Sequence, residues 1–163
     1  MKLHFLLLCF ICFGNSTMAQ PDSMPIYLRF PTLPPFSITK IPDSSRFVKD
    51  DLLKKRSTLI FIFSPDCDHC RQKTKELTAN IHLFKKVQVI MASPLEHMIL
   101  KKFYEAYKIG DHPNIILGRD PTYFFGTFYK IHSLPSLFLY DKKGNFVKAF
   151  DGHVPVQRIA EFL

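Results

Sequence analysis

Cysteine is scarce in this sequence, and its scarcity excludes two classes of protein. The chain has four cysteines, and two of them, Cys9 and Cys12, lie among its apolar first residues. The remainder keeps one pair, Cys67 and Cys70, which is too few for a disulfide-stabilised scaffold. The pair is also only half of the ligand set of a structural zinc site. A bridge over so short a spacing closes a tiny loop and stabilises little through chain entropy.

Glycine and tryptophan are the next shortages. The six glycines form no loop that would cradle a phosphate group, which excludes the common nucleotide-binding motifs. Tryptophan is absent altogether. No Ser-His-Asp constellation, internal repeat or second domain is visible. What remains is a chain of 163 residues, long enough for one domain with its own hydrophobic core.

The chain is basic, with a formal net charge of +8. Its lysines are scattered in pairs along the sequence rather than clustered with aromatic residues, so we expect a solvated basic surface and no nucleic-acid partner. Weak attraction to an anionic membrane surface or to an acidic partner is compatible with this charge.

The first 19 residues have the layout of a secretory signal peptide. Lys2 precedes an apolar run over residues 3–13, and residues 17–19 offer a cleavage site. The run is shorter than the roughly 20 residues that span a membrane. We therefore expect an exported protein of the periplasm or cell envelope, with no stable membrane insertion after cleavage. An uncleaved signal would leave the chain anchored.

Prolines cluster in residues 21–42, which hold six of the 12 in the chain. We predict that residues 20–35 form a proline-rich leader without helix, because proline disrupts helical hydrogen bonding. Residues 36–163 are the predicted domain. Within it, the alternation in residues 36–41 indicates an edge strand, and residues 46–56 indicate a short helix or turn.

Beyond residue 57 the pattern is that of an α/β protein. Residues 58–63 and 87–92 are apolar runs rich in β-branched residues that suit strands buried on both faces. A helix is predicted over residues 67–84. A second helix is predicted to begin with Ser93 as its N-cap and Pro94 as its first residue. The apolar stripe of this second helix would consist of Leu95, Met98, Ile99, Phe103 and Ala106.

The remaining segments complete a sheet. Residues 114–118 indicate a short strand, residues 121–132 an aromatic helix or loop, and residues 136–141 and 146–151 a β-hairpin. A helix over residues 154–163 ends the chain. Crossovers come first and a hairpin last, so we predict an α/β fold with a central mixed β-sheet flanked by helices.

The cysteine pair falls where the strand over residues 58–63 meets the helix that follows. The sulfur of Cys67 would lie at the helix N-terminus, near unpaired N–H groups that favour thiolate over thiol. Cys70 follows one turn later on the same face. We therefore expect Cys67 to attack a substrate disulfide and Cys70 to resolve the mixed disulfide.

Three further features bear on this chemistry. His69, if protonated, would favour the Cys67 thiolate, and Asp68 would act in the opposite direction. We interpret Asp68 as a solvated loop residue, whereas for His69 tuning and a solvated loop residue are equally good interpretations. Pro135 stands just before the predicted hairpin. A cis bond between Leu134 and Pro135 would bring this loop against the cysteines, with the Leu134 backbone available to an extended substrate.

These residues resemble the thioredoxin superfamily, and in particular its exported TlpA/ResA-like thiol–disulfide oxidoreductases. The resemblance covers residues 36–163 and rests on LIFIFSPDCDHCR, on YKIHSLPSLFLYDKKGNFV and on the distance between them. It implies a thioredoxin-like fold with Cys67 as nucleophile, Cys70 as resolving thiol and Pro135 as the cis-proline. It also implies protein thiol or disulfide substrates, a redox-recycling partner and no bound cofactor.

The sequence departs from that family in three places. Asp66 stands where a tryptophan usually precedes the first cysteine, and Phe61 stands where thioredoxin has a buried acid. Lys73 replaces a glutamate that TlpA/ResA-like members often carry, and Glu76 follows one turn later. A proton acceptor for Cys70 is therefore not identified, and the direction of exchange stays open.

Two rival functions remain. A copper-binding module similar to the Sco assembly factors would use Cys67, Cys70 and His132, since two thiolates and one imidazole suit copper. Against it, that family spaces its cysteines C-x-x-x-C, and Pro135 would crowd the site. A redox-inert binding module would keep the fold alone, but two intact cysteines argue against it.

Overall fold

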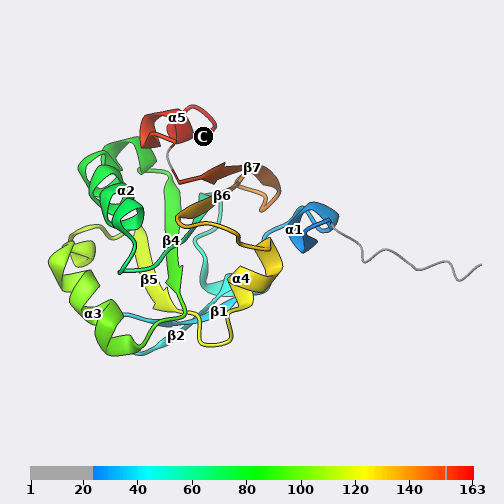
Figure 1. Cartoon of the computed structure of the whole chain (residues 1–163). Coiled ribbons are helices and arrows are strands. Elements are labelled where there is room, and N and C mark those ends of the chain that lie inside the picture. The colour runs from blue at the N-terminus through cyan, green and yellow to red at the C-terminus, as the bar shows by residue number, and fades with distance from the viewer. Residues whose placement is uncertain (1–23, 153) are drawn as a thin grey trace, which may run out of the picture.

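A computed structural model describes residues 24–152 and 154–163. The predicted signal peptide, residues 1–19, lies outside the described residues. One seven-stranded sheet forms the centre of the molecule, and its strand order is β2-β1-β5-β4-β3-β6-β7 (Figure 1). The strands are β1 (Ser37–Lys40), β2 (Arg46–Val48), β3 (Ser57–Ile62), β4 (Val87–Ser93), β5 (Ile115–Arg119), β6 (Ser136–Tyr140) and β7 (Phe146–Asp151).

The sheet is mixed, and helices flank it, as predicted. Strands β3, β4 and β5 run parallel, whereas β6, β7, β1 and β2 join through antiparallel pairs. The helices are α1 (Ile26–Arg29), α2 (Asp68–Ala79), α3 (His97–Ala106), α4 (Phe124–Tyr129) and α5 (Val156–Ala160). Short 3-10 turns span Lys49–Asp51, Ile81–Phe84 and Ile109–Asp111.

The central strand β3 divides the core into two clusters. All six of its residues are buried, which confirms the prediction of a strand covered on both faces. Leu59 and Phe61 point to the cluster under α2, α3 and α5, whereas Ile60 and Ile62 point to the cluster under α4. Successive side chains of a strand face opposite sides, so one apolar run supplies both layers.

The proline-rich stretch is not free of helix, so that expectation was wrong. Residues 26–29 contain no proline and form the single turn α1, with Pro25 just before it. Tyr27 anchors this turn because its ring packs against Tyr129 and Phe138. Leu33 is buried, and its N–H donates to the carbonyl of Gly144 at 2.8 Å. The second half of the predicted leader therefore packs on the domain.

The first two strands also differ from expectation. The predicted edge strand is β1, but β2 pairs with its outer side and β5 with its inner side. Residues 46–48, predicted as helix or turn, form β2, and only Lys49–Asp51 is helical. Phe47 explains the difference, because its buried ring stacks on Phe36 next to β1.

Two helices begin or end differently from the prediction. Asn80 ends α2 early, where its side-chain amide donates to the carbonyl of Glu76 at 2.8 Å. Ser93 is not the N-cap of α3, because it stays in β4 opposite Arg119, and Glu96 holds that position instead. The predicted stripe was therefore only partly right. Phe103 is buried and Leu95 packs against the core, whereas Met98 and Ile99 are 63% and 40% exposed, and the buried Leu100 was not predicted.

The hairpin of β6 and β7 is confirmed, with Leu137 opposite Phe150. The last helix is confirmed but shorter than predicted, over Val156–Ala160. Within residues 24–152 and 154–163, no helix has both the length and the apolar character needed to cross a membrane.

Candidate active site

The cysteine pair lies where β3 passes into α2, as the sequence predicted. Cys67 occupies the N-cap position with extended backbone angles, and Asp68 is the first helical residue. The turn before it is closed by the Cys67 N–H, which donates to the carbonyl of Ser64 at 3.1 Å. Because β3 is held between β4 and β6, the start of α2 is fixed at the carboxyl end of the parallel strands.

Cys67 is the outer cysteine. It is half-buried, and its Sγ accepts the backbone N–H of Cys70 at 3.2 Å. This N–H is one of the helix-terminal donors that lack an intrahelical partner, and a sulfur anion is a better acceptor for it than a thiol. Cys67 Sγ therefore supplies an acceptor to a backbone donor at the start of α2.

Cys70 is the inner cysteine, and its side chain is fully buried. Burial, followed by the hydrogen bond with Cys67, raises the pKa of the Cys70 thiol to about 12. The positive charge of Arg71 acts in the opposite direction, toward a lower pKa. The two sulfurs are thus unequal: one is reachable and poised as an acceptor, and the other is shielded and protonated at neutral pH.

The loop before β6 faces this pair, as predicted. The Leu134–Pro135 bond is cis, and the Leu134 carbonyl accepts a hydrogen bond from Cys67 Sγ at 3.7 Å. The carbonyl of Pro135 accepts the Gly152 N–H at 2.9 Å, which joins the loop to the end of β7. The reduced pair therefore already occupies one backbone group of Leu134 that was expected to meet substrate.

A pocket lies beside this loop, between it and the segment that joins β7 to α5. Its volume is about 620 Å³, and its lining is mainly apolar, with Leu134, Gly152, Val154 and Pro155 among its residues. Leu134 is both a lining residue of this pocket and the residue whose carbonyl accepts the hydrogen bond from Cys67 Sγ. A hollow of about 660 Å³ elsewhere, near Lys75 and Tyr107, lies at the far end of α2.

The charged residues around the cysteines lie in water. Asp66, Asp68 and His69 are all exposed. Arg71 donates to the Pro65 carbonyl at 2.9 Å and forms an ion pair with Asp68. The negative charge expected to oppose a Cys67 thiolate is therefore partly offset by the next basic residue along the helix. The i, i+3 spacing of Asp68 and Arg71 can be recognised in the sequence. The contact of Arg71 with the Pro65 carbonyl, in contrast, depends on the turn that precedes the helix.

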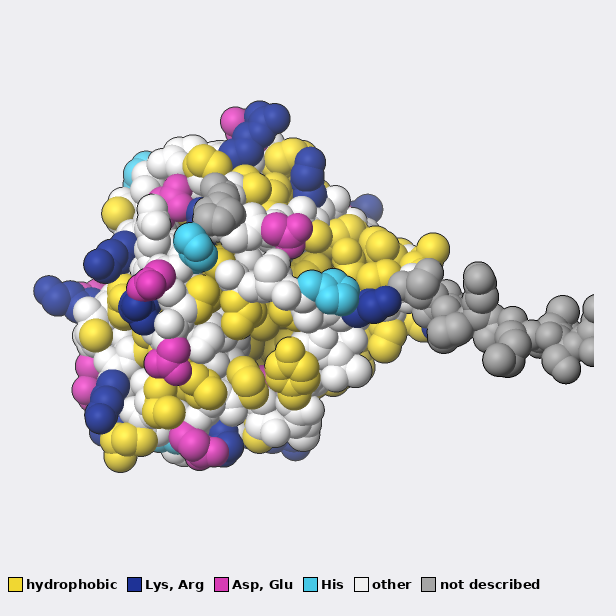
Figure 2. Space-filling model, viewed as in Figure 1, with side chains coloured by type: hydrophobic (Ala, Val, Ile, Leu, Met, Phe, Trp, Pro, Cys, Tyr) yellow, Lys and Arg dark blue, Asp and Glu magenta, His cyan; other side chains and the backbone are white. Residues whose placement is uncertain are grey.

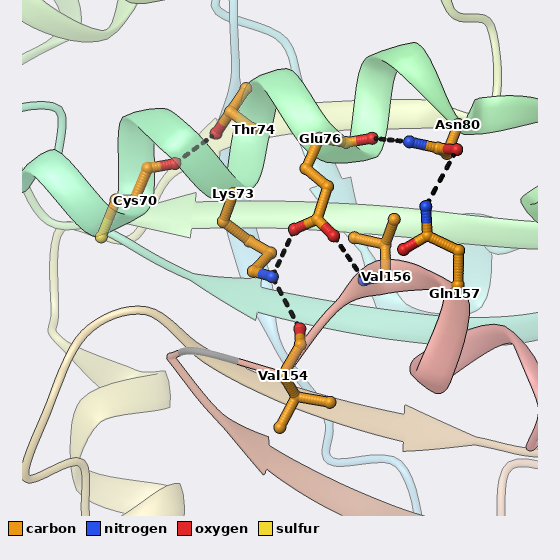
Figure 3. Close-up of polar contacts among 8 residues, drawn as sticks. All are labelled: Cys70, Lys73, Thr74, Glu76, Asn80, Val154, Val156 and Gln157. Carbon is orange, nitrogen blue, oxygen red and sulfur yellow. Dashed lines mark hydrogen bonds and ion pairs between the residues drawn. The ribbon is translucent and has the colours of Figure 1, made fainter.

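Sequence reasoning treated Lys73 and Glu76 only as departures from a family pattern, and the structure gives them a role. Lys73 is buried, and its Nζ donates to Glu76 Oε2 and to the Val154 carbonyl, both at 2.6 Å (Figure 3). Glu76 Oε1 accepts the Val156 N–H at 2.9 Å. The pair fastens α2 to the start of α5.

This ion pair does not provide the missing proton acceptor for Cys70. The Cys70 pKa is shifted by burial and by three neighbouring residues, Cys67, Ser64 and Arg71, and none of these three residues is a carboxylate. In Figure 3 the side chains of Lys73 and Glu76 reach toward Val154 and Val156 and away from the Cys70 sulfur. Their function is to hold the β7–α5 segment against the cysteine-bearing helix.

The structure does not favour the copper site. In the part of the chain that the structure describes, no three His, Cys, Asp or Glu side chains come together as a metal-binding group. His132 is exposed in the loop before β6, so it does not join Cys67 and Cys70 as a third ligand.

Comparison with known proteins gives a consistent picture. A family model described as a thioredoxin-like domain matches residues 51–163. A search of curated proteins finds no match. Among solved structures, StoA from Bacillus subtilis has a TM-score of 0.62 and 16% identity, covering 81% of this chain and 98% of that one.

Two structures from Bacteroides are similar to the same degree. A thiol-disulfide oxidoreductase from Bacteroides fragilis has a TM-score of 0.66 at 16% identity, covering 81% of this chain and 99% of that one. The C-terminal domain of a protein from Bacteroides thetaiotaomicron, described with the same activity, has a TM-score of 0.65 at 17% identity, covering 80% and 93%. At these identities the likeness is one of fold.

Proposed function

The chain belongs to the family of thioredoxin-like domains, and from that premise we propose that it is an exported thiol–disulfide oxidoreductase acting through Cys67 and Cys70. The family match confirms the resemblance and the thioredoxin-like fold stated from the sequence. The enzyme class is supported by that family and by neighbours whose names carry this activity. Export rests on the predicted signal peptide, residues 1–19.

One observation carries the proposal: the two sulfurs are close, connected and unequal. Cys67 Sγ accepts the N–H of Cys70 while remaining half-buried, and Cys70 has no exposed surface. A structural disulfide would gain nothing from such asymmetry. An exchange reaction needs it, because one sulfur must meet the substrate and the other must attack only after the first has reacted.

In the reducing direction the Cys67 thiolate attacks one sulfur of a substrate disulfide. That disulfide breaks, a Cys67–substrate disulfide forms, and the released substrate sulfur takes a proton. Cys70 then loses its proton to solvent and attacks Cys67 Sγ, which forms the Cys67–Cys70 disulfide and releases the second substrate thiol. The substrate gains two electrons and the enzyme loses them. Substrate oxidation is the same sequence reversed.

The substrates we propose are protein thiols or disulfides in the exported compartment, together with a partner that recycles the pair. The pocket beside Leu134 supports a polypeptide substrate, because a side chain next to the reacting cysteine would find apolar surface there. The reduction potential of the pair decides the direction. A value near −270 mV, the approximate value for thioredoxin, indicates a reductase, and one near −120 mV indicates an oxidase.

The proposal is tested by trapping substrates. In the Cys70→Ser variant the resolving step is blocked, so Cys67 should accumulate mixed disulfides with exported proteins that dissolve on reduction. Cys67→Ser is the matched control, because it keeps Cys70 but removes the exposed sulfur, and it should trap nothing. If Cys70→Ser traps no protein although Cys67 still reacts with a small alkylating reagent, the exchange function is wrong.

A further inference from the structure

The short helix α1 and its neighbours expose an unusual amount of apolar surface. Met24, Ile26, Leu28 and Phe30 are 53%, 38%, 45% and 60% exposed. They follow one another at alternate positions of the chain, where it enters the described domain. Figure 2 shows hydrophobic side chains gathered on this projecting part of the molecule. Contiguous exposed apolar side chains are typical of an interaction surface, whereas single ones are not.

The exposure is not a sign of a loosely attached segment. Tyr27, between two of the exposed residues, packs its ring against Tyr129, Phe138 and Phe146 with centroid distances of 5.5, 5.1 and 5.2 Å. The Phe30 N–H closes the helical turn on the carbonyl of Ile26 at 2.9 Å. The turn is therefore fixed to the domain by its inward ring, and Ile26 and Leu28 stay partly exposed on either side of that ring.

Basic side chains border this apolar surface. Arg29 lies within α1, with its guanidinium 5.8 Å from the centre of the Phe30 ring. The turn carrying Lys142 and Lys143 lies beside residues 31–33, because the Leu33 N–H donates to the Gly144 carbonyl at 2.8 Å. Both lysines are exposed. The carboxylate of that turn, Asp141, is engaged by the N–H groups of Lys143 and Asn145 at 2.8 Å.

We propose that this α1 surface, formed by Met24, Ile26, Leu28 and Phe30 with Lys142 and Lys143, rests on the anionic face of a lipid bilayer. Apolar side chains surrounded by lysine and arginine are the combination that binds the interface of such a membrane. The contact is peripheral and reversible, with the domain lying on the bilayer. It rests on the proposed export, which would place the chain beside the outer face of a membrane.

A second copy of the chain is the competing occupant of this surface, and the charges of Lys142 and Lys143 disfavour it. A two-fold contact through the α1 surface would bring Lys142 and Lys143 of both copies to one interface, where like charges repel. The bilayer proposal also leaves the site accessible. In Figure 1, α1 lies on the opposite side of the molecule from α2, the helix whose first turn carries the cysteines.

The test is co-sedimentation of the purified exported protein with phosphatidylcholine vesicles, with and without phosphatidylglycerol. We expect binding that requires phosphatidylglycerol and weakens with salt. Leu28→Ser with Phe30→Ser should weaken it at least about tenfold, from the lost apolar burial. Lys142→Gln with Lys143→Gln should weaken it about fivefold for each lysine and remove the preference for anionic lipid.

The matched control is Met98→Ser with Ile99→Ser, which removes two exposed apolar side chains from α3 and should leave vesicle binding unchanged. Equal binding by the Leu28/Phe30 variant and the wild type would overturn the proposal. A dimer in sedimentation velocity that this variant abolishes would assign the surface to a second copy instead. Thiol–disulfide exchange is measured on every variant, so a failure here is distinguishable from a failure of the proposed enzyme function.

Discussion

The charged side chains in the first and second turns of α2 lie in different environments: those of the first turn are exposed to water, and the Lys73 side chain of the second is buried. In the first turn Asp68 and His69 are exposed beside the cysteines, and the ion pair of Asp68 with Arg71 is open to water. In the second turn Lys73 is buried and holds both Glu76 and the Val154 carbonyl. Water screens the first set, so those charges adjust the chemistry by small amounts. The second set is desolvated, so it determines whether the helix stays docked.

The largest effect should come from breaking the buried pair. Glu76→Ala leaves the Lys73 ammonium without its carboxylate and the Val156 N–H without its acceptor. We expect a loss of about 3 kcal/mol in the free energy of unfolding, toward the lower end of such losses because Glu76 is partly exposed. Chemical denaturation measures it. Asp68→Ala is the control from the first turn and should cost less than about 1 kcal/mol. Equal losses would abolish the distinction between the turns.

The second effect is a pH dependence of the unfolding free energy that arises from Cys70, which lies between the two turns. Its pKa is raised from 9.0 in the unfolded chain to about 12 in the folded one. A raised pKa means that the folded state keeps the proton longer, so this contribution to stability is complete below about pH 9 and is lost as pH rises toward 12. Tyr129 and Tyr140 also have raised pKa values, so the curve must be compared with a variant.

The measurement is the difference in unfolding free energy between the reduced wild type and Cys70→Ala as a function of pH. We expect a constant difference up to about pH 9 and a decline above it, because only the wild type carries this thiol. A difference that stays flat to the highest accessible pH would show that Cys70 is not desolvated as its burial indicates. Burial, the largest cause of the raised Cys70 pKa, does not depend on Cys67, so the resolving step should accelerate as pH rises.

The smallest effect should come from the first turn. Arg71→Gln removes the positive charge that offsets Asp68 beside the Cys67 thiolate of the proposed reaction. The reduced form loses some stabilisation, so the reduction potential should fall. An exposed pair is worth about 0.2–1 kcal/mol, which corresponds to a shift of about 5–20 mV. Equilibration with glutathione measures the shift. Asp68→Asn should move the potential the other way, and a shift of the same sign in both variants would contradict this account.

Much of the fold was predictable because apolar periodicity reports burial directly. The run over residues 58–63 was predicted as a central strand, and β3 is buried throughout. The predicted start of α3 was wrong for a specific reason: Ser93 and Pro94 have the residue types of a helix start, but pairing of Ser93 with Arg119 extends β4. That pairing joins distant parts of the chain, and local sequence does not record it. The failure of the helix-free leader has the same origin, since Tyr27 is anchored by rings more than 100 residues away.

In the candidate site, too, the features that depend on neighbouring residues were predicted, and those that depend on distant contacts were not. Spacing and position were enough to pick out Cys67, Cys70 and Pro135, because a C-x-x-C pair at a strand–helix junction and a proline before a hairpin are local patterns. The role of Lys73 was missed, although the i, i+3 spacing to Glu76 could have indicated the pair. Its partners Val154 and Val156 lie about 80 residues further along.

The sequence by itself determined the order of the elements from β3 onward, the cysteine pair at the start of α2 and the inequality of its two sulfurs, because periodicity, spacing and helix termini are properties of neighbouring residues. Only the tertiary structure decided which charged side chains are buried and which stay exposed to water. Lys73 and Asp68 are both ionisable side chains of one helix, but one is covered by the β7–α5 segment and the other is left in water. Desolvation makes that difference, and it is set by segments that meet only when the chain has folded.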